Sequence, residues 1–126
     1  MKTKIKKYNN DNIQLASMSL ENGELIVIPT DTVYGIIADS RNSKAVNNIF
    51  EVKKRPKTMP LILFINTLKA ALKIAYFSKI EKDAANFFWP GSLTLIVKKK
   101  KNNLFYGDKR TQKIGLRIPN HPVVLD

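Results

Sequence analysis

The chain alternates between short, largely apolar runs and longer stretches with helical spacing of their apolar residues. The runs predict buried β-strands at 24–28, 60–65, 92–97 and 113–118. Strands separated by helices indicate an α/β fold, with helices packed on a sheet. Helices are predicted over 11–22, after Asn42 or Ser43, from Thr67 to Ala75, from Ser78 to the Trp89-Pro90-Gly91 sequence, and over the final HPVVLD with Asn120 as its cap.

The last two predicted strands differ from the others in how they are connected. Only the polar loop 98–112 lies between 92–97 and 113–118, with no helical segment. Parallel neighbours need a longer crossover, usually a helix, so we expect this pair to be antiparallel. The helix-separated strands allow parallel neighbours, and the sequence therefore predicts a mixed sheet.

Composition limits the possible chemistry. The chain has 126 residues, 44% of them apolar, which suits one ordinary domain with a core. It has no cysteine and one histidine, which excludes disulfides, thiolate chemistry and a multi-histidine metal site. The basic N-terminus is followed by polar residues rather than an apolar signal segment, and no apolar run approaches a membrane span. We therefore predict a cytoplasmic protein without a membrane partner.

The net charge of +12 favours a polyanionic partner such as a nucleotide or RNA. A second explanation remains open. Lysine, asparagine and isoleucine are abundant, as in proteins from AT-rich genomes, and such a bias raises the charge without a functional demand.

Four polar clusters lie at or near the ends of the apolar strands, where open α/β sheets place their ligands. Each cluster mixes charged, hydroxyl or amide groups with proline or glycine, which is more than a plain turn requires. The clusters are Thr30-Asp31-Thr32-Val33-Tyr34-Gly35, Lys53-Lys54-Arg55-Pro56, Trp89-Pro90-Gly91-Ser92-Leu93-Thr94, and Arg117 with Asn120 and His121.

Taken singly, most of these residues also have an ordinary structural explanation. Lys53 continues the apolar face of Val46 and Ile49 at a helix end, where a cation favours the helix dipole. Arg55 follows two residues later, and the alternative is that Lys53 and Arg55 bind a phosphate together. Strand alternation sends Arg117 to the face opposite its apolar neighbours, where it binds a carboxylate only if that face is concave. Thr94 and His121 are individually more typical of structural roles.

Together, PTDTVYGI, KKRPKTMPL, WPGSLTLIV and IGLRIPNHP closely resemble the YrdC-like family of threonylcarbamoyl-AMP synthases, from about residue 9 onward. The resemblance implies an α/β fold: a twisted mixed sheet with flanking helices and a basic concave face. It also implies a reaction in which L-threonine, bicarbonate and ATP give threonylcarbamoyl-AMP and pyrophosphate. The product supplies the threonylcarbamoyl group for a tRNA adenosine, so tRNA and the downstream transfer machinery are implied partners.

The resemblance also assigns site residues. It implies ATP binding by Lys53, Arg55 and Thr94, with Mg²⁺ accompanying the ATP. It implies a threonine site of Thr30, Thr32 and Tyr34, with Arg117 pairing with the substrate carboxylate. No acid–base residue or nucleophile is implied, because positioning and charge neutralisation suit this reaction. Phe64 occupies the place where many relatives have a histidine.

The family has an S-x-N motif after the segment that matches IGLRIPNHP, and none follows it here, so we expect a single YrdC-like domain, 1–126, that is incomplete at its C-terminus. Activity of this short chain is therefore open. The alternatives are a non-catalytic module that binds tRNA or double-stranded RNA, and a non-functional gene remnant. A carbamoyltransferase branch of the same fold is disfavoured, because it normally carries zinc motifs and this chain has no cysteine.

Overall fold

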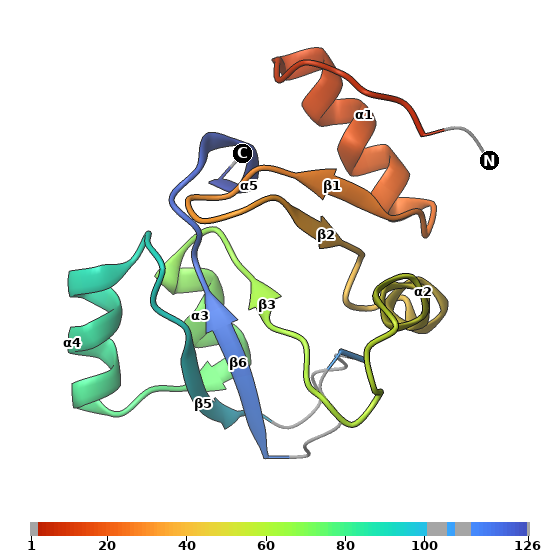
Figure 1. The fold of residues 1–126 in the computed structure, drawn as a ribbon. Coiled ribbons are helices and arrows are strands. Elements are labelled where there is room, and N and C mark those ends of the chain that lie inside the picture. The colour runs from red at the N-terminus through yellow and green to blue at the C-terminus, as the bar shows by residue number, and fades with distance from the viewer. Residues whose placement is uncertain (1–2, 101–105, 108–111, 126) are drawn as a thin grey trace.

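A computed structural model describes residues 3–100, 106–107 and 112–125 of the chain (Figure 1). Helices and strands alternate along most of this length, as the apolar pattern predicts. The helices are α1 (Asn10–Glu21), α2 (Ser43–Lys53), α3 (Leu68–Ile74), α4 (Lys79–Phe88) and α5 (Pro122–Leu125). The strands are β1 (Ile26–Ile28), β2 (Gly35–Ile37), β3 (Leu63–Phe64), β4 (Ala75–Tyr76), β5 (Leu95–Lys99) and β6 (Lys113–Arg117).

The strands form a hairpin and a separate curled sheet. β1 and β2 pair antiparallel, with Ile28 opposite Gly35. The second sheet has the order β3-β6-β5-β4, in which β3 is parallel to β6 and the other pairs are antiparallel (Figure 1). The prediction of a mixed sheet with an antiparallel β5–β6 pair is confirmed.

Three strands begin later than predicted, and β1 does so at Ile26 rather than at residue 24. Pro60 has no N–H to give to a ladder, and the run 60–65 forms a strand only at Leu63–Phe64. Residues 92–94 belong to the connection after α4, where Gly91 N donates to Ile118 O at 2.8 Å. β5 instead extends through Lys99, beyond the predicted end at residue 97, because Lys99 pairs with Ala75.

The structure confirms three predicted helix starts and corrects a fourth. The side chains of Asn42 and Thr67 accept backbone N–H groups at 3.0 and 3.1 Å, and Ser78 with Glu81 forms a reciprocal capping box. Asn120 does not begin the last helix as predicted. His121, directly before Pro122, takes that place, and its Nδ1 accepts the N–H of Val123 at 3.1 Å.

The core lies on one face of the curled sheet, under α3 and α4. Inward side chains of β5 and β6 alternate with outward ones, so Val97 and Leu116 are buried while Ile96 is 55% exposed. The buried cluster comprises Ala71, Ala75, Ala85, Trp89, Val97, Ile114, Leu116 and Ile118. The sheet's opposite face is thereby left for the hairpin side of the molecule.

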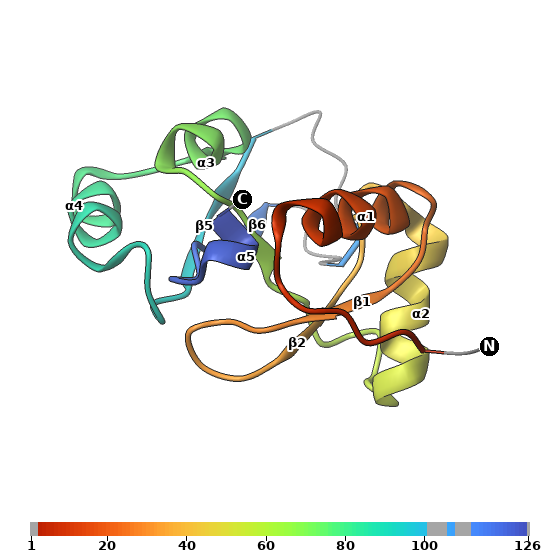
Figure 2. The same ribbon diagram turned by 90° about the horizontal axis from the view of Figure 1, so that it is seen from above.

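Figure 2 shows α3 and α4 on one side of the curled sheet, and the β1–β2 hairpin, α1 and α2 on the other. Helix α2 buries Ala45, Val46, Ile49 and Phe50, and β1 buries Ile28. Arg117 lies on the hairpin side, because its neighbour Leu116 points into the core. This arrangement places the polar strand ends around a shared space between the two sheets.

Candidate functional site

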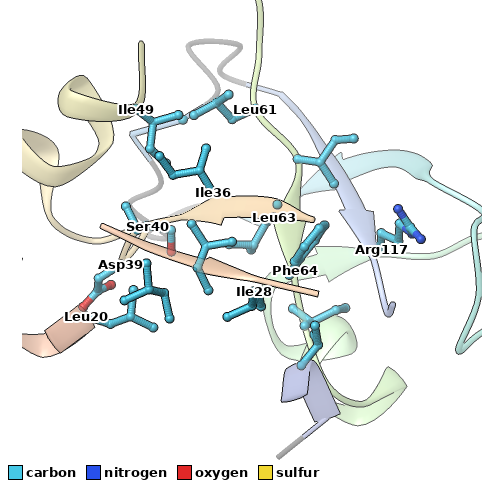
Figure 3. A pocket seen from close by; sticks show the side chains of 18 of the residues that line it. Leu20, Ile28, Ile36, Asp39, Ser40, Ile49, Leu61, Leu63, Phe64 and Arg117 are labelled. Atoms are coloured by element: carbon cyan, nitrogen blue, oxygen red, sulfur yellow. The ribbon is translucent and has the colours of Figure 1, made fainter. Parts of the chain in front are cut away.

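A cavity of about 1120 Å³ lies between the hairpin and the curled sheet. Its walls come from α1, β1, β2 and α2 on one side and from β3, α3, β6 and α5 on the other, together with the loops between them. Most lining side chains are apolar, among them Ile28, Ile36 and Leu63, and Figure 3 shows Arg117 beside Phe64. The cavity is also lined by six of the seven predicted site residues: Thr30, Thr32, Tyr34, Lys53, Arg55 and Arg117.

The hairpin loop 29–34 is organised by its two threonine hydroxyls. Thr30 Oγ1 donates to Val33 O at 2.5 Å and accepts the N–H of Thr32 at 3.2 Å. Each hydroxyl has one hydrogen, so the 3.2 Å contact between the two Oγ1 atoms is a bond donated by Thr32. The Thr30 hydroxyl is thus fully used inside the loop, and it sets the loop's shape.

Arg117 joins this loop to the curled sheet through all three guanidinium nitrogens. Nη2 pairs with Asp31 Oδ1, and Nη1 donates weakly to Thr32 Oγ1 at 3.5 Å. Nε donates to Gly91 O at 3.0 Å. The guanidinium carbon also lies 6.0 Å from the centre of the Phe64 ring, within the range of a cation–π contact. The side chain is therefore held in one orientation at the cavity wall.

The connection after α4 builds the acceptor for Arg117. The Trp89 indole donates to Leu93 O at 2.7 Å, and the Trp89–Pro90 peptide is cis. A Cβ at Gly91 would lie closer than 3.0 Å to Phe88 O, so this turn has room only for glycine. The Trp89-Pro90-Gly91 turn therefore fixes the position of the carbonyl oxygen that accepts the Nε bond of Arg117.

Lys53 and Arg55 come from the C-terminal end of α2. Lys54 between them adopts the left-handed conformation, with φ 53°, and the next residue's N–H bonds back to Phe50 O at 2.9 Å. Arg55 Nη2 donates to Pro60 O at 2.9 Å, while its buried Nε has no hydrogen-bond partner among the described residues. A buried guanidinium donor without a partner, beside a lysine on the same cavity, is an arrangement suited to an anion. Lys53 lines the cavity together with Val46 and Ile49, as expected from their spacing, but its side chain is exposed rather than buried.

Thr94 is the predicted site residue that does not line the cavity. It precedes β5, and the β5–β6 register, extended by one residue, places it opposite Arg117. Its predicted ATP contact stays a prediction. Tyr34 lines the cavity and is 74% exposed.

Asp31 is a residue of this site whose contact the sequence did not reveal. Its pairing with Arg117 joins positions that lie 86 residues apart. An aspartate in a turn is common for backbone reasons, so its presence in PTDT gave no distinguishing signal.

Two features are absent from the described residues. No group of three or more His, Asp or Glu side chains there is arranged to hold a metal ion. None of the helices in the described part of the chain has the length and apolar character needed to cross a membrane.

Comparison with known proteins identifies the family. Residues 18–126 match the model of the Sua5/YciO/YrdC family, whose description reads "Telomere recombination". This chain belongs to the Sua5/YciO/YrdC family. It is 34% identical over 121 residues to the threonylcarbamoyl-AMP synthase of Bacillus subtilis, covering 93% of this chain and 34% of that protein. It is 34% identical over 115 residues to that of Pseudoalteromonas translucida, covering 89% of this chain and 62% of the relative.

Solved structures of the family agree with the fold. Pyrococcus abyssi Sua5 complexed with L-threonine superposes with a TM-score of 0.84 at 31% identity, covering 95% of this chain and 36% of that one. Escherichia coli YciO superposes with a TM-score of 0.82 at 23% identity, covering 95% and 59% of the two chains. The predicted YrdC-like α/β fold is confirmed. The chain spans between about a third and two thirds of the length of these relatives.

Proposed function

We propose that this protein carries the substrate site of a threonylcarbamoyl-AMP synthase. The observation that carries the proposal is that Arg117, with its threonine-rich loop, and the Lys53–Arg55 pair line one cavity. A carboxylate-binding group and a phosphate-binding pair on one cavity suit a reaction that joins an amino acid to a nucleotide. The P. abyssi relative, whose structure was solved with L-threonine, supports the same assignment.

In this proposal Arg117 and the hairpin loop hold L-threonine, and Lys53 and Arg55 hold the ATP phosphates. The threonine ammonium first loses a proton, and the resulting amine attacks CO₂ and loses a second proton, or attacks bicarbonate with release of water, to give a carbamate. A carbamate oxygen then bonds to the α-phosphorus of ATP while the bond from that phosphorus to pyrophosphate breaks. The site contributes by orienting the reactants and neutralising charge.

Mg²⁺ would arrive with the ATP phosphates in this proposal. With a nucleotide, Mg²⁺ is usually bound by phosphate oxygens and water together with one or two protein ligands. Lys53 and Arg55 would supply the protein's part of the charge neutralisation, the lysine as a point charge and the arginine as a planar fork.

The first experiment is calorimetric titration of Mg-ATP into the Lys53→Ala and Arg55→Ala variants. We expect each to weaken binding by about 1.5–3 kcal/mol, the range for hydrogen bonds to charged groups. Lys57→Ala is the matched control, because Lys57 is exposed nearby and does not line the cavity. Unchanged affinity in both site variants, with a wild type that binds, would remove the phosphate-clamp role.

A second candidate function, RNA binding, is favoured by Tyr76 on the edge strand β4. Tyr76 is 54% exposed as a residue, and the ammonium nitrogens of Lys98 and Lys100 lie 5.7 and 5.2 Å from the centre of its ring. An exposed ring beside cations suits base stacking combined with phosphate contacts. Binding of tRNA without ATP, weakened by salt and by Tyr76→Ala, would support this function, and salt-insensitive or absent binding would exclude it.

A further inference from the structure

The Asp31–Arg117 ion pair stands at the position proposed for the substrate carboxylate. The two side chains are only 16% and 11% exposed, although the Asp31 backbone is open to solvent. Both neighbours of Asp31 in the loop, Thr30 and Thr32, line the cavity. A carboxylate binds a guanidinium best through two parallel hydrogen bonds, and a ligand that uses both Nη atoms of Arg117 in this way competes with Asp31 Oδ1 and Thr32 Oγ1 for them.

The consequence depends on what becomes of Asp31 after displacement. Separating a largely buried ion pair is strongly unfavourable when one charge is left without a partner. A ligand with a carboxylate alone satisfies Arg117 and leaves Asp31 unpaired. An α-amino acid carries an ammonium group one carbon away from its carboxylate, so it can offer a partner to both residues of the opened pair.

We propose that Asp31 is a specificity-determining residue that makes this site selective for α-amino acid zwitterions. The inference rests on the proposed threonine site and adds to it a residue that reads the substrate's ammonium group. The carboxylate of the ligand binds Arg117, and the ammonium binds the released Asp31. A site built around such a polar partner rejects the analogue that lacks it, because its own buried group stays unpaired.

The Arg117 contacts fit this exchange. The Nε bond to Gly91 O holds the guanidinium against the connection after α4, independently of the hairpin loop. The Nη1 bond to Thr32 is long, at 3.5 Å, and is therefore weakly held. The two nitrogens that face the loop can change partners while the arginine keeps its place.

The test compares L-threonine, 3-hydroxybutyrate, which lacks the amine, and threoninol, which lacks the carboxylate, by calorimetric titration. The wild type should bind L-threonine at least tenfold more tightly than either analogue. Asp31→Asn should weaken L-threonine at least tenfold and leave 3-hydroxybutyrate as tight or tighter, so that the preference between them largely disappears. Asp83→Asn, on the exposed surface of α4, is the matched control and should leave every affinity unchanged.

Several results would overturn the inference. A wild type that binds L-threonine and 3-hydroxybutyrate equally well contradicts it without any variant. If Asp31→Asn leaves L-threonine binding unchanged or makes it tighter, Asp31 only competes with the substrate carboxylate for Arg117 and does not bind the ammonium. If Arg117→Gln abolishes L-threonine binding while Asp31→Asn keeps both affinity and preference, only this inference fails. If the wild type binds no L-threonine, the proposed function fails with it.

Discussion

Replacing Gly91 by alanine tests how tightly the WPG turn is built under the site. An alanine Cβ at this position would lie closer than 3.0 Å to the backbone oxygen of Phe88, and backbone cannot move aside as a flexible side chain can. Overpacking of this kind typically costs about 1–3 kcal/mol of the free energy of unfolding. The carbonyl of Gly91 also accepts the Nε bond of Arg117, so a shifted turn should weaken L-threonine binding as well.

The assay is equilibrium urea unfolding, with Gly115→Ala as the matched control. A Cβ at Gly115 would meet its nearest neighbours, Ile62 and Thr94, at 3.8 and 3.9 Å, which is ordinary contact. With a slope of about 1–3 kcal/mol per molar urea, Gly91→Ala should lower the midpoint by roughly 1 M. Gly115→Ala should change stability by less than about 1 kcal/mol in either direction. Equal losses in the two variants, or none at Gly91, would refute the steric argument.

Two other outcomes follow from the structure. Lys54→Gly should raise the free energy of unfolding by about 0.5–1 kcal/mol in urea titration, because glycine removes the strain of the left-handed conformation at φ 53°. A loss of stability would show instead that the Lys54 side chain makes a contact worth more than that strain. A polypeptide of these 126 residues corresponds to 34% of the B. subtilis relative and should hold the reacting groups less precisely. A misplacement of reacting groups by about 1 Å costs about a hundredfold in rate, so we expect its threonine- and bicarbonate-dependent release of pyrophosphate to be at least about a hundredfold slower than that of the relative. Comparable turnover would contradict this.

The helix starts and the face of the sheet on which Arg117 lies could be predicted from the sequence. Asn42, Thr67 and the Ser78–Glu81 pair each mark a helix start through a side chain that reaches only three residues along the chain. The outward placement of Arg117 followed from strand alternation. In each case the deciding interaction is local, so the pattern carries it.

Features that depend on tertiary pairing were not predicted. β4 has two residues, too few to show a period, and it forms because Ala75 meets Lys99. β2 was missed although Ile36 and Ile37 follow Gly35 at hairpin distance from β1, a signal that could have been used. The Asp31–Arg117 pair depends on where the hairpin lies against the curled sheet, which no local spacing records.

A crystal structure of the protein with bound L-threonine would test the proposed site directly. We expect the ligand carboxylate to lie on the guanidinium of Arg117, the ammonium on Asp31, and the Arg117 Nε bond to Gly91 O to be retained. L-threonine bound elsewhere, with the Asp31–Arg117 pair intact, would contradict this expectation.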